Sequence, residues 1–260
     1  MALALMMAFI AGCSRQTRKR GLTVAGSTSV QPFADRWAEV YMLENRGRMV
    51  NVQGGGSSAG IQAARSGAAD IGTSSRELRP EEKDLLEMIV AWDGLAVIVH
   101  PQNPIADLNL LQVRNIFAGY IRNWPEVGGA KNGINVVTRE EGSGTRGAFQ
   151  ELVMGKTRIF KGAIVQDSNG TVREIVAHDP HSIGYISLGL VNEKVKAVSL
   201  EGIAPTYANI DAKQYRLIRP FLFVISGPPK PMAQEFINFV LSRKGQDLIK
   251  KEGLIPVFRE

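Results

Sequence analysis

Three loops in this chain combine residues that could bind an anion. Residues 26–29, 56–58 and 142–145 each place Gly and Ser, with Thr in the first and third, between a predicted strand and a segment with helical spacing. A helix N-terminus presents unpaired backbone N–H groups and a partial positive charge, glycine permits close approach, and hydroxyls add donors. One such loop serves equally well as an ordinary helix cap. Three in one chain predict an anion site.

The third loop is preceded by an arginine. Arg139 follows a predicted strand at residues 135–138. Its guanidinium offers a planar fork of N–H donors that matches a tetrahedral oxyanion. Arg139 is therefore placed to reach the same ligand as Ser143 and Thr145, and Glu141 is placed to hold the guanidinium. The alternative is an ion pair in a surface loop.

Residues 56–60 also match the G-x-S-x-G pattern of serine hydrolases, with Ser58 as the nucleophile. The Asp and His residues that a triad needs follow in the chain as Asp167, His178, Asp179 and His181. This alternative is weaker, because a triad leaves the other two loops unexplained. His178 and His181 flank a proline, which favours solvated loop histidines over a helical metal pair.

Predicted strands and helices alternate along the chain, which favours an α/β architecture with largely parallel sheets. Strands are expected at residues 22–25, 49–53, 69–73, 95–99, 135–138, 183–187, 196–200 and 222–225. Helices are expected at residues 30–44, 59–66, 80–86, 111–118, 145–154, 169–177, 232–241 and 245–251. Two domains would have to be joined by strands within the fold, and 95–99 and 222–225 are the best candidates for crossings.

Seven ordered motifs give the chain a resemblance to a known family. They are residues 25–30, 54–60, 70–76, 93–99, 116–119, 123–124 and 139–146. Together they resemble the phosphate-binding component of high-affinity phosphate ABC transporters, over about residues 22–258. The resemblance implies a type II-like periplasmic-binding-protein fold, α/β and two-lobed with two crossings, that closes over phosphate.

The resemblance also implies an organisation and a set of partners. The first lobe would hold residues 22–97 plus 223–260, and the second residues 98–222. Binding would close the cleft by a hinge motion. A monomeric protein would deliver phosphate to a membrane permease, with no metal, organic cofactor, nucleic acid or enzymatic activity implied. A receptor for sulfate, molybdate or another oxyanion, and a phosphate-sensing or adhesive surface protein, stay open as alternatives.

The family's ligand positions can be carried over residue by residue. They fall on Thr28 or Ser29, Ser57, Arg139, Ser143, Gly144 and Thr145, with Glu141 as the acid that braces the arginine. Ser75 stands where some members have an aspartate that accepts the phosphate proton and repels sulfate. A serine repels no anion, so selectivity against sulfate is left open. Arg76 would either add charge to the cleft or face solvent.

The composition suits an ordinary globular protein, with 44% hydrophobic and 22% charged residues and a net charge of +6. Residues 1–12 are uncharged and almost wholly apolar. They are shorter than the ~20 residues of a membrane-spanning helix and fit the apolar part of a secretory signal. Residues 10–13 resemble a bacterial lipoprotein processing box, which predicts lipidation of Cys13, the only cysteine, and a polar tether ending at residue 21. No Lys or Arg precedes Cys13, and an incidental cysteine in an apolar N-terminus is the alternative.

Overall fold

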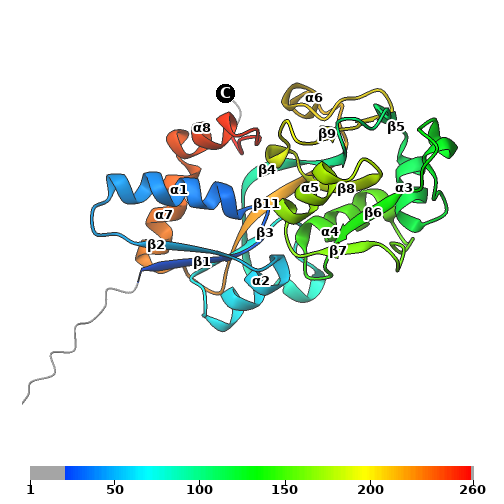
Figure 1. Ribbon diagram of the computed structural model, residues 1–260. Helices are drawn as coiled ribbons and strands as arrows, with labels where there is room; N and C mark the ends of the chain where they lie inside the picture. Colours follow the sequence, from blue (N-terminus) through cyan, green and yellow to red (C-terminus); the bar gives the residue numbers. More distant parts are fainter. Residues whose placement is uncertain (1–20, 259–260) are drawn as a thin grey trace, which may run out of the picture.

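The computed structural model describes residues 21–258 and shows two lobes side by side (Figure 1). One path of paired strands runs through both lobes in the order β2-β1-β3-β11-β4-β8-β6-β7. Its strands are β1 (Leu22–Gly26), β2 (Val50–Gly54), β3 (Ile71–Ser74), β4 (Leu86–Val99), β6 (Asn135–Arg139), β7 (Ile164–Gln166), β8 (Ser182–Ser187) and β11 (Ile218–Ile225). The predicted two-lobed α/β fold is confirmed.

The first lobe has helices on both faces of its sheet. Its helices are α1 (Gln31–Glu44), α2 (Ser57–Ser66), α7 (Pro231–Leu241), α8 (Arg243–Lys251) and the 3-10 turn η1 (Pro80–Glu82). Phe33, Trp37 and Tyr41 recur every four residues on α1 and are buried with α7 and α8 against one face. The Trp37 indole donates to the carbonyl of Gly245 at 2.8 Å, which ties α1 to α8. Ile61 of α2 packs on the other face.

The second lobe is built around a group of stacked aromatic rings. Its helices are α3 (Leu110–Ala118), α4 (Gly144–Phe149), α5 (Asn169–His178) and α6 (Tyr207–Asp211), with the π-helical turn η3 (Gln150–Met154) and the 3-10 turns η2 (Trp124–Val127) and η4 (Leu188–Leu190). Its short strands are β5 (Asp107–Leu108), β9 (Lys196–Ala197) and β10 (Ser199–Leu200). The rings of Phe149 and Tyr185 stack with centroids 4.0 Å apart, and Phe117 packs edge-on against Phe149. These contacts fix α4 against β8.

Two long strands, β4 and β11, connect the lobes. Residues of β4 up to Gly94 pair with β11, whereas those from Leu95 onward pair with β8 of the second lobe. The predicted crossings at 95–99 and 222–225 lie on these strands, but both strands begin earlier than the apolar pattern indicated. The lobe boundaries at residues 97/98 and 222/223 stay a prediction.

Several predicted elements differ from the structure. The helix expected at 80–86 is only the short turn η1, because β4 already begins at Leu86. The helix expected at 145–154 is α4 followed by the π-helical turn η3. The sheet is mixed, since β11 runs antiparallel to both β3 and β4. β4 leads the chain into the second lobe and β11 leads it back, so β11 runs opposite to its two neighbours.

The N-terminal predictions fall outside the described residues. The predicted signal at residues 1–12, the lipidation site Cys13 and most of the predicted tether precede residue 21, where the description begins. From residue 21 to residue 258, no helix combines the length and the apolar character that a membrane crossing needs.

Gly60 sets the distance between α2 and the sheet. A Cβ atom at this position would lie 2.5 Å from both the carbonyl oxygen of Ala25 and the Cα of Gly26. We expect Gly60→Ala to lower the free energy of unfolding by about 1–3 kcal/mol, as other overpacked core positions do. Equilibrium denaturant unfolding measures this change.

Gly170→Ala is the matched control, because Gly170 also lies in a helix but is exposed, and the nearest atom to its added Cβ is 3.7 Å away. We expect this variant to gain up to about 1 kcal/mol from helix propensity. Equal free energies of unfolding for the two variants would show that α2 does not need this close approach.

Candidate functional site

The two lobes meet at a cluster of buried polar side chains. Polar groups are costly to bury unless they are hydrogen-bonded, so a cluster of this size needs a function beyond core packing. Each member has at most 2% of its surface exposed: Ser27, Ser29, Ser57, Ser75, Asp93, Arg139, Ser143, Thr145, Asn169 and Arg219. Most of them come from strand ends and helix starts of both lobes, and helix starts have unpaired backbone N–H groups, whereas Asp93 lies within β4.

Arg139, the last residue of β6, is the central cation of this cluster. Its Nε and Nη2 atoms donate to the two carboxylate oxygens of Glu140, each at 3.0 Å. Nε also donates to the carbonyl of Gln166 at 3.2 Å, and Nη2 to that of Asp167 at 2.9 Å. The remaining nitrogen, Nη1, is buried and has no hydrogen-bond partner in the protein. A buried guanidinium nitrogen without a partner indicates a place for an anion.

Tyr185 holds the backbone of Arg139 in position. Its hydroxyl lies 2.7 Å from the Thr138 hydroxyl and accepts from the backbone N–H of Arg139 at 3.4 Å. Burial raises the pKa of Tyr185, so the phenol stays neutral and does not add a competing negative charge. The stacked ring of Phe149 then links the position of Arg139 to α4.

The brace of Arg139 was predicted wrongly as Glu141. Glu140 makes these bonds, whereas Glu141 has 93% of its side chain exposed and lies 3.9 Å from the Arg146 guanidinium. The reason is local backbone geometry. The chain turns directly after β6, with the Ser143 N–H bonded to the Glu140 carbonyl at 3.1 Å, and this turn brings the Glu140 side chain back to its neighbour.

The structure brings the predicted ligands Ser57 and Ser75 to the start of α4. Ser57 is the first residue of α2, and its hydroxyl accepts from the Ser75 N–H at 3.1 Å. A Cβ atom on Gly144 would lie 2.1 Å from the Ser57 oxygen and 2.6 Å from the Ser75 oxygen. Only glycine fits at this position, and both hydroxyls face the helix start in the other lobe.

The loop between β1 and α1 completes the contact between the lobes. The Thr28 hydroxyl accepts from Nη2 of Arg139 at 3.2 Å. The Ser29 and Thr145 hydroxyls lie 2.7 Å apart. The sequence left open whether Thr28 or Ser29 belongs to the site, and in the structure both lie in it. The lobes are therefore closed on each other at this cluster.

The side chains of two other predicted site residues, Ser143 and Arg76, are already hydrogen-bonded within the protein. The Ser143 hydroxyl caps α4 by accepting from the Arg146 N–H at 3.2 Å. Arg76 is buried in a two-bond pair with Glu82, at 2.7 and 2.9 Å, and its stem packs against Gly147 of α4. Arg76 thus neither adds free charge to the cleft nor faces solvent.

Three site residues escaped the sequence analysis. Asn169, the first residue of α5, donates to the Ser29 hydroxyl at 2.9 Å. It follows β7 in the same strand, polar loop and helix order as the other loops, but that short exposed strand was not recognised. Arg219 of β11 and Asp93 of β4 form an ion pair, in which Nη2 of Arg219 lies 2.8 Å from Oδ2 of Asp93. No local sequence pattern marks a pair 126 residues apart.

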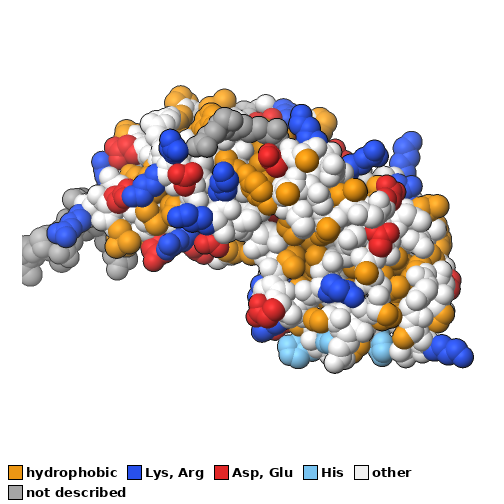
Figure 2. Space-filling model, turned by 90° about the horizontal axis from the view of Figure 1, so that it is seen from above, with side chains coloured by type: hydrophobic (Ala, Val, Ile, Leu, Met, Phe, Trp, Pro, Cys, Tyr) orange, Lys and Arg blue, Asp and Glu red, His pale blue; other side chains and the backbone are white. Residues whose placement is uncertain are grey.

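The serine-hydrolase alternative finds no support in the site. The Ser58 hydroxyl accepts from Arg76 at 3.4 Å, and the His178 ring bonds the Glu174 carbonyl at 2.7 Å. Within residues 21–258 no hydrogen bond joins Ser58 to a histidine. Figure 2 shows the visible histidine side chains gathered at the end of the second lobe. No group of His, Cys, Asp and Glu in the described chain is arranged to hold a metal ion.

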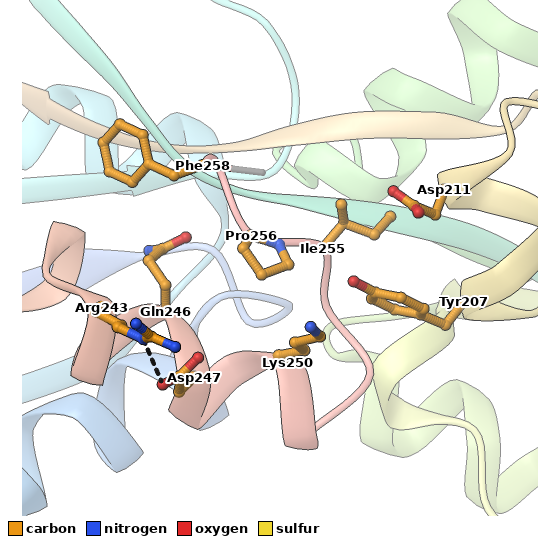
Figure 3. A pocket seen from close by; sticks show the side chains of 9 residues that line it. All are labelled: Tyr207, Asp211, Arg243, Gln246, Asp247, Lys250, Ile255, Pro256 and Phe258. Atoms are coloured by element: carbon orange, nitrogen blue, oxygen red, sulfur yellow. Dashed lines mark ion pairs between the residues drawn. The ribbon is translucent and has the colours of Figure 1, made fainter. Parts of the chain in front are cut away.

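A separate cavity of about 470 Å³ lies between α6 and α8, where the C-terminal segment passes (Figure 3). Its charged lining residues carry both signs, and Arg243 and Asp247 pair along α8 at 4.0 Å. Ile255 enters the core of the second lobe there and pairs with Trp92 of β4. This mixed lining does not select for an anion, unlike the buried cluster at Arg139.

The comparisons with known proteins agree with this geometry. A family model described as a PBP superfamily domain matches residues 13–244. The phosphate-binding protein PstS of Bacillus subtilis (strain 168) is 33% identical over 91% of this chain and 80% of that protein. PstS of Borreliella burgdorferi is 30% identical over 94% of this chain and 93% of that protein.

Two solved structures are similar over nearly the whole chain. A protein from Clostridium perfringens crystallised with bound phosphate has a TM-score of 0.89 and 40% identity, covering 92% of this chain and 100% of its own. An ABC-type phosphate transport receptor from Vibrio cholerae has a TM-score of 0.75 and 39% identity, covering 90% of this chain and 99% of its own.

The two adjacent acids offer a direct test of the site's geometry. We expect Glu140→Gln to weaken the binding of inorganic phosphate by about tenfold, because charge-assisted bonds worth about 1.5–3 kcal/mol hold the Arg139 fork. Glu141→Gln, its exposed neighbour, should leave the dissociation constant unchanged. Isothermal titration of both variants measures the difference, and a larger loss for Glu141→Gln would contradict the assignment.

Proposed function

Because this chain belongs to the PBP superfamily, in the same family as the PstS phosphate-binding proteins, we propose that it binds inorganic phosphate between its lobes. We further propose that it delivers this phosphate to the permease of an ABC transporter. The relatives are named as binding proteins, and we assign binding rather than catalysis to this chain as well.

One observation carries the proposal. The Arg139 guanidinium is buried and fixed by five acceptor atoms, yet its Nη1 atom has no partner in the protein. A tetrahedral oxyanion supplies the missing acceptor. Nη1 is buried, and burial strengthens each charge-assisted bond that a ligand would make to it.

The remaining ligands are proposed from the same cluster. The candidates are the hydroxyls of Thr28, Ser57, Ser75 and Thr145, with the backbone of Gly144 at the start of α4. Ser29 would contribute through its contact with Thr145. Ser143 would act mainly as the cap that orients α4, and Arg76, paired with Glu82, as a packing contact against α4. Both lobes contribute donors, which couples binding to hinge closure. We take residues 22–97 plus 223–260 as one lobe and 98–222 as the other.

The arrangement bears on selectivity between phosphate and sulfate. Ser75 presents a hydroxyl, and the two carboxylates in or beside the cluster are already engaged, Glu140 by Arg139 and Asp93 by Arg219. Any acceptor for the phosphate proton is then a hydroxyl oxygen. Selectivity against sulfate would rest on that single weak hydrogen bond rather than on charge repulsion.

The cellular setting is proposed from the sequence and the family. Lipidation of Cys13 would hold a monomeric protein at the outer side of a bacterial membrane, in the periplasm or at the cell surface, through a short polar tether. On the face shown in Figure 2, Lys and Arg are interspersed with Asp and Glu over the first lobe and form no single basic patch. Nucleic acid is therefore not a proposed partner.

Titration of the ligand-free protein with phosphate and then with sulfate tests this proposal. We expect micromolar or tighter binding of phosphate and a loss of at least about tenfold for Arg139→Ala, because an uncompensated buried anion costs 1.4 kcal/mol or more. Arg36→Ala, which removes an exposed arginine on α1, is the matched control.

The outcomes separate the candidate functions. Equal binding of phosphate and sulfate would indicate a broader oxyanion receptor. Unchanged phosphate affinity in Arg139→Ala would show that the site is elsewhere. Absence of binding to either anion would leave a sensing or adhesive role for the surface protein.

A further inference from the structure

A buried ion pair lies beneath the hydroxyls of the site. Arg219 of β11 and Asp93 of β4 face each other as direct cross-strand partners, and neither side chain has more than 1% of its surface exposed. Nε of Arg219 donates to Asp93 at 2.9 Å, and the Ser187 hydroxyl donates to the other carboxylate oxygen at 2.8 Å. Apolar residues at such positions often stabilise a fold as well as an ion pair does. The pair therefore needs a reason other than stability.

Arg219 also reaches two residues of the candidate site. Its Nη2 atom donates to the Ser29 hydroxyl at 3.1 Å, and Nη1 donates to the Ser75 carbonyl at 3.3 Å. Asn169 reaches Ser29 from the other lobe at 2.9 Å. The orientation of the Asn169 amide is fixed, because its oxygen accepts from the Ser187 N–H at 3.2 Å.

These contacts determine the direction of a hydroxyl chain. A serine hydroxyl has one proton to donate and two lone pairs to accept. Arg219 and Asn169 can only donate to Ser29, so both of its lone pairs are occupied. Ser29 must then donate its proton to Thr145, 2.7 Å away. The Thr145 hydroxyl, which accepts that bond, is left with its own proton free to donate.

We propose that Arg219 is a positioning residue of the anion site, which acts through Ser29 to make the Thr145 hydroxyl a fixed donor to the bound phosphate. Asp93 holds the guanidinium in place and cancels its charge. This inference rests on the proposed function. It assigns to the crossing strands a part in binding that is separate from their part in joining the lobes.

The charges around the cluster agree with this role. Burial lowers the pKa of Arg219, and the nearby Arg139 charge lowers it further, whereas Asp93 opposes both effects. Burial likewise raises the pKa of Asp93 against the opposing effect of Arg219. The Asp93 charge thus compensates for that of Arg219. Arg139 is itself paired with Glu140, and its unpartnered Nη1 remains for the ligand.

A double-mutant cycle between Arg219 and Thr145 tests the inference. The variants are Arg219→Lys, which keeps a cation beside Asp93, and Thr145→Val, which removes the final hydroxyl with little change in shape. We expect Arg219→Lys to lower phosphate affinity about threefold to tenfold. We expect Thr145→Val to lower it about tenfold. If Arg219 acts through Thr145, the double variant loses no more than Thr145→Val alone.

The controls separate positioning from stability. Trp37→Phe loses a buried hydrogen bond in the first lobe, away from the cluster, and should lower the melting temperature while leaving phosphate affinity unchanged. If Arg219→Lys does not fold, the double change Asp93→Asn with Arg219→Met removes both buried charges and takes its place in the cycle.

The result can overturn the inference without overturning the function. Independent losses that multiply in the double variant, or wild-type affinity in Arg219→Lys, would show that Arg219 has only a structural role. In both cases the wild-type protein still binds phosphate. A wild-type protein that binds no phosphate would overturn the proposed function, and this inference with it.

Discussion

The guanidinium of Arg139 is buried between two lobes, and most features of the site follow from what such a charge requires. A buried cation must be paired and hydrogen-bonded. Glu140 and two backbone carbonyls satisfy one side of the fork, and the other side is left to a ligand. Gly144 lets a helix start approach the Ser57 and Ser75 hydroxyls in the opposite lobe. The site is complete only when the lobes are closed.

The crossing strands contribute to this site and also join the lobes. β4 changes its partner from β11 to β8 at Gly94 and Leu95, next to the Asp93–Arg219 pair. The proposed hinge motion about these strands would therefore move the second lobe relative to an ion pair that belongs to both crossings. Ser29 receives bonds from Arg219 on a crossing strand and from Asn169 in the second lobe. The proposed closure would thus set the orientation of the Ser29 hydroxyl and, through it, of Thr145.

Sequence reasoning succeeded where the signal is local and failed where it is not. The loops at Ser29, Ser57 and Thr145 follow from neighbouring residues, because a helix start needs small polar residues there. Glu140 was missed because the backbone turn after β6 decides whether Glu140 or Glu141 contacts Arg139. Asp93 and Arg219 interrupt apolar runs, which made both crossing strands look shorter than they are. Their pairing depends on tertiary contact between distant segments, which no local pattern encodes.

The position of β11 also governs the order in which the protein can fold. This strand lies between β3 and β4 in the middle of the first sheet, yet it is made after the whole second lobe. As the chain emerges from the ribosome at about 5–20 residues per second, β1, β2 and β3 appear first but lack their central neighbour. The main sheet of the second lobe, by contrast, is complete once β8 and β9 have emerged. The lobe that begins the chain is therefore the last to be finished, and its early strands need protection from aggregation while they wait.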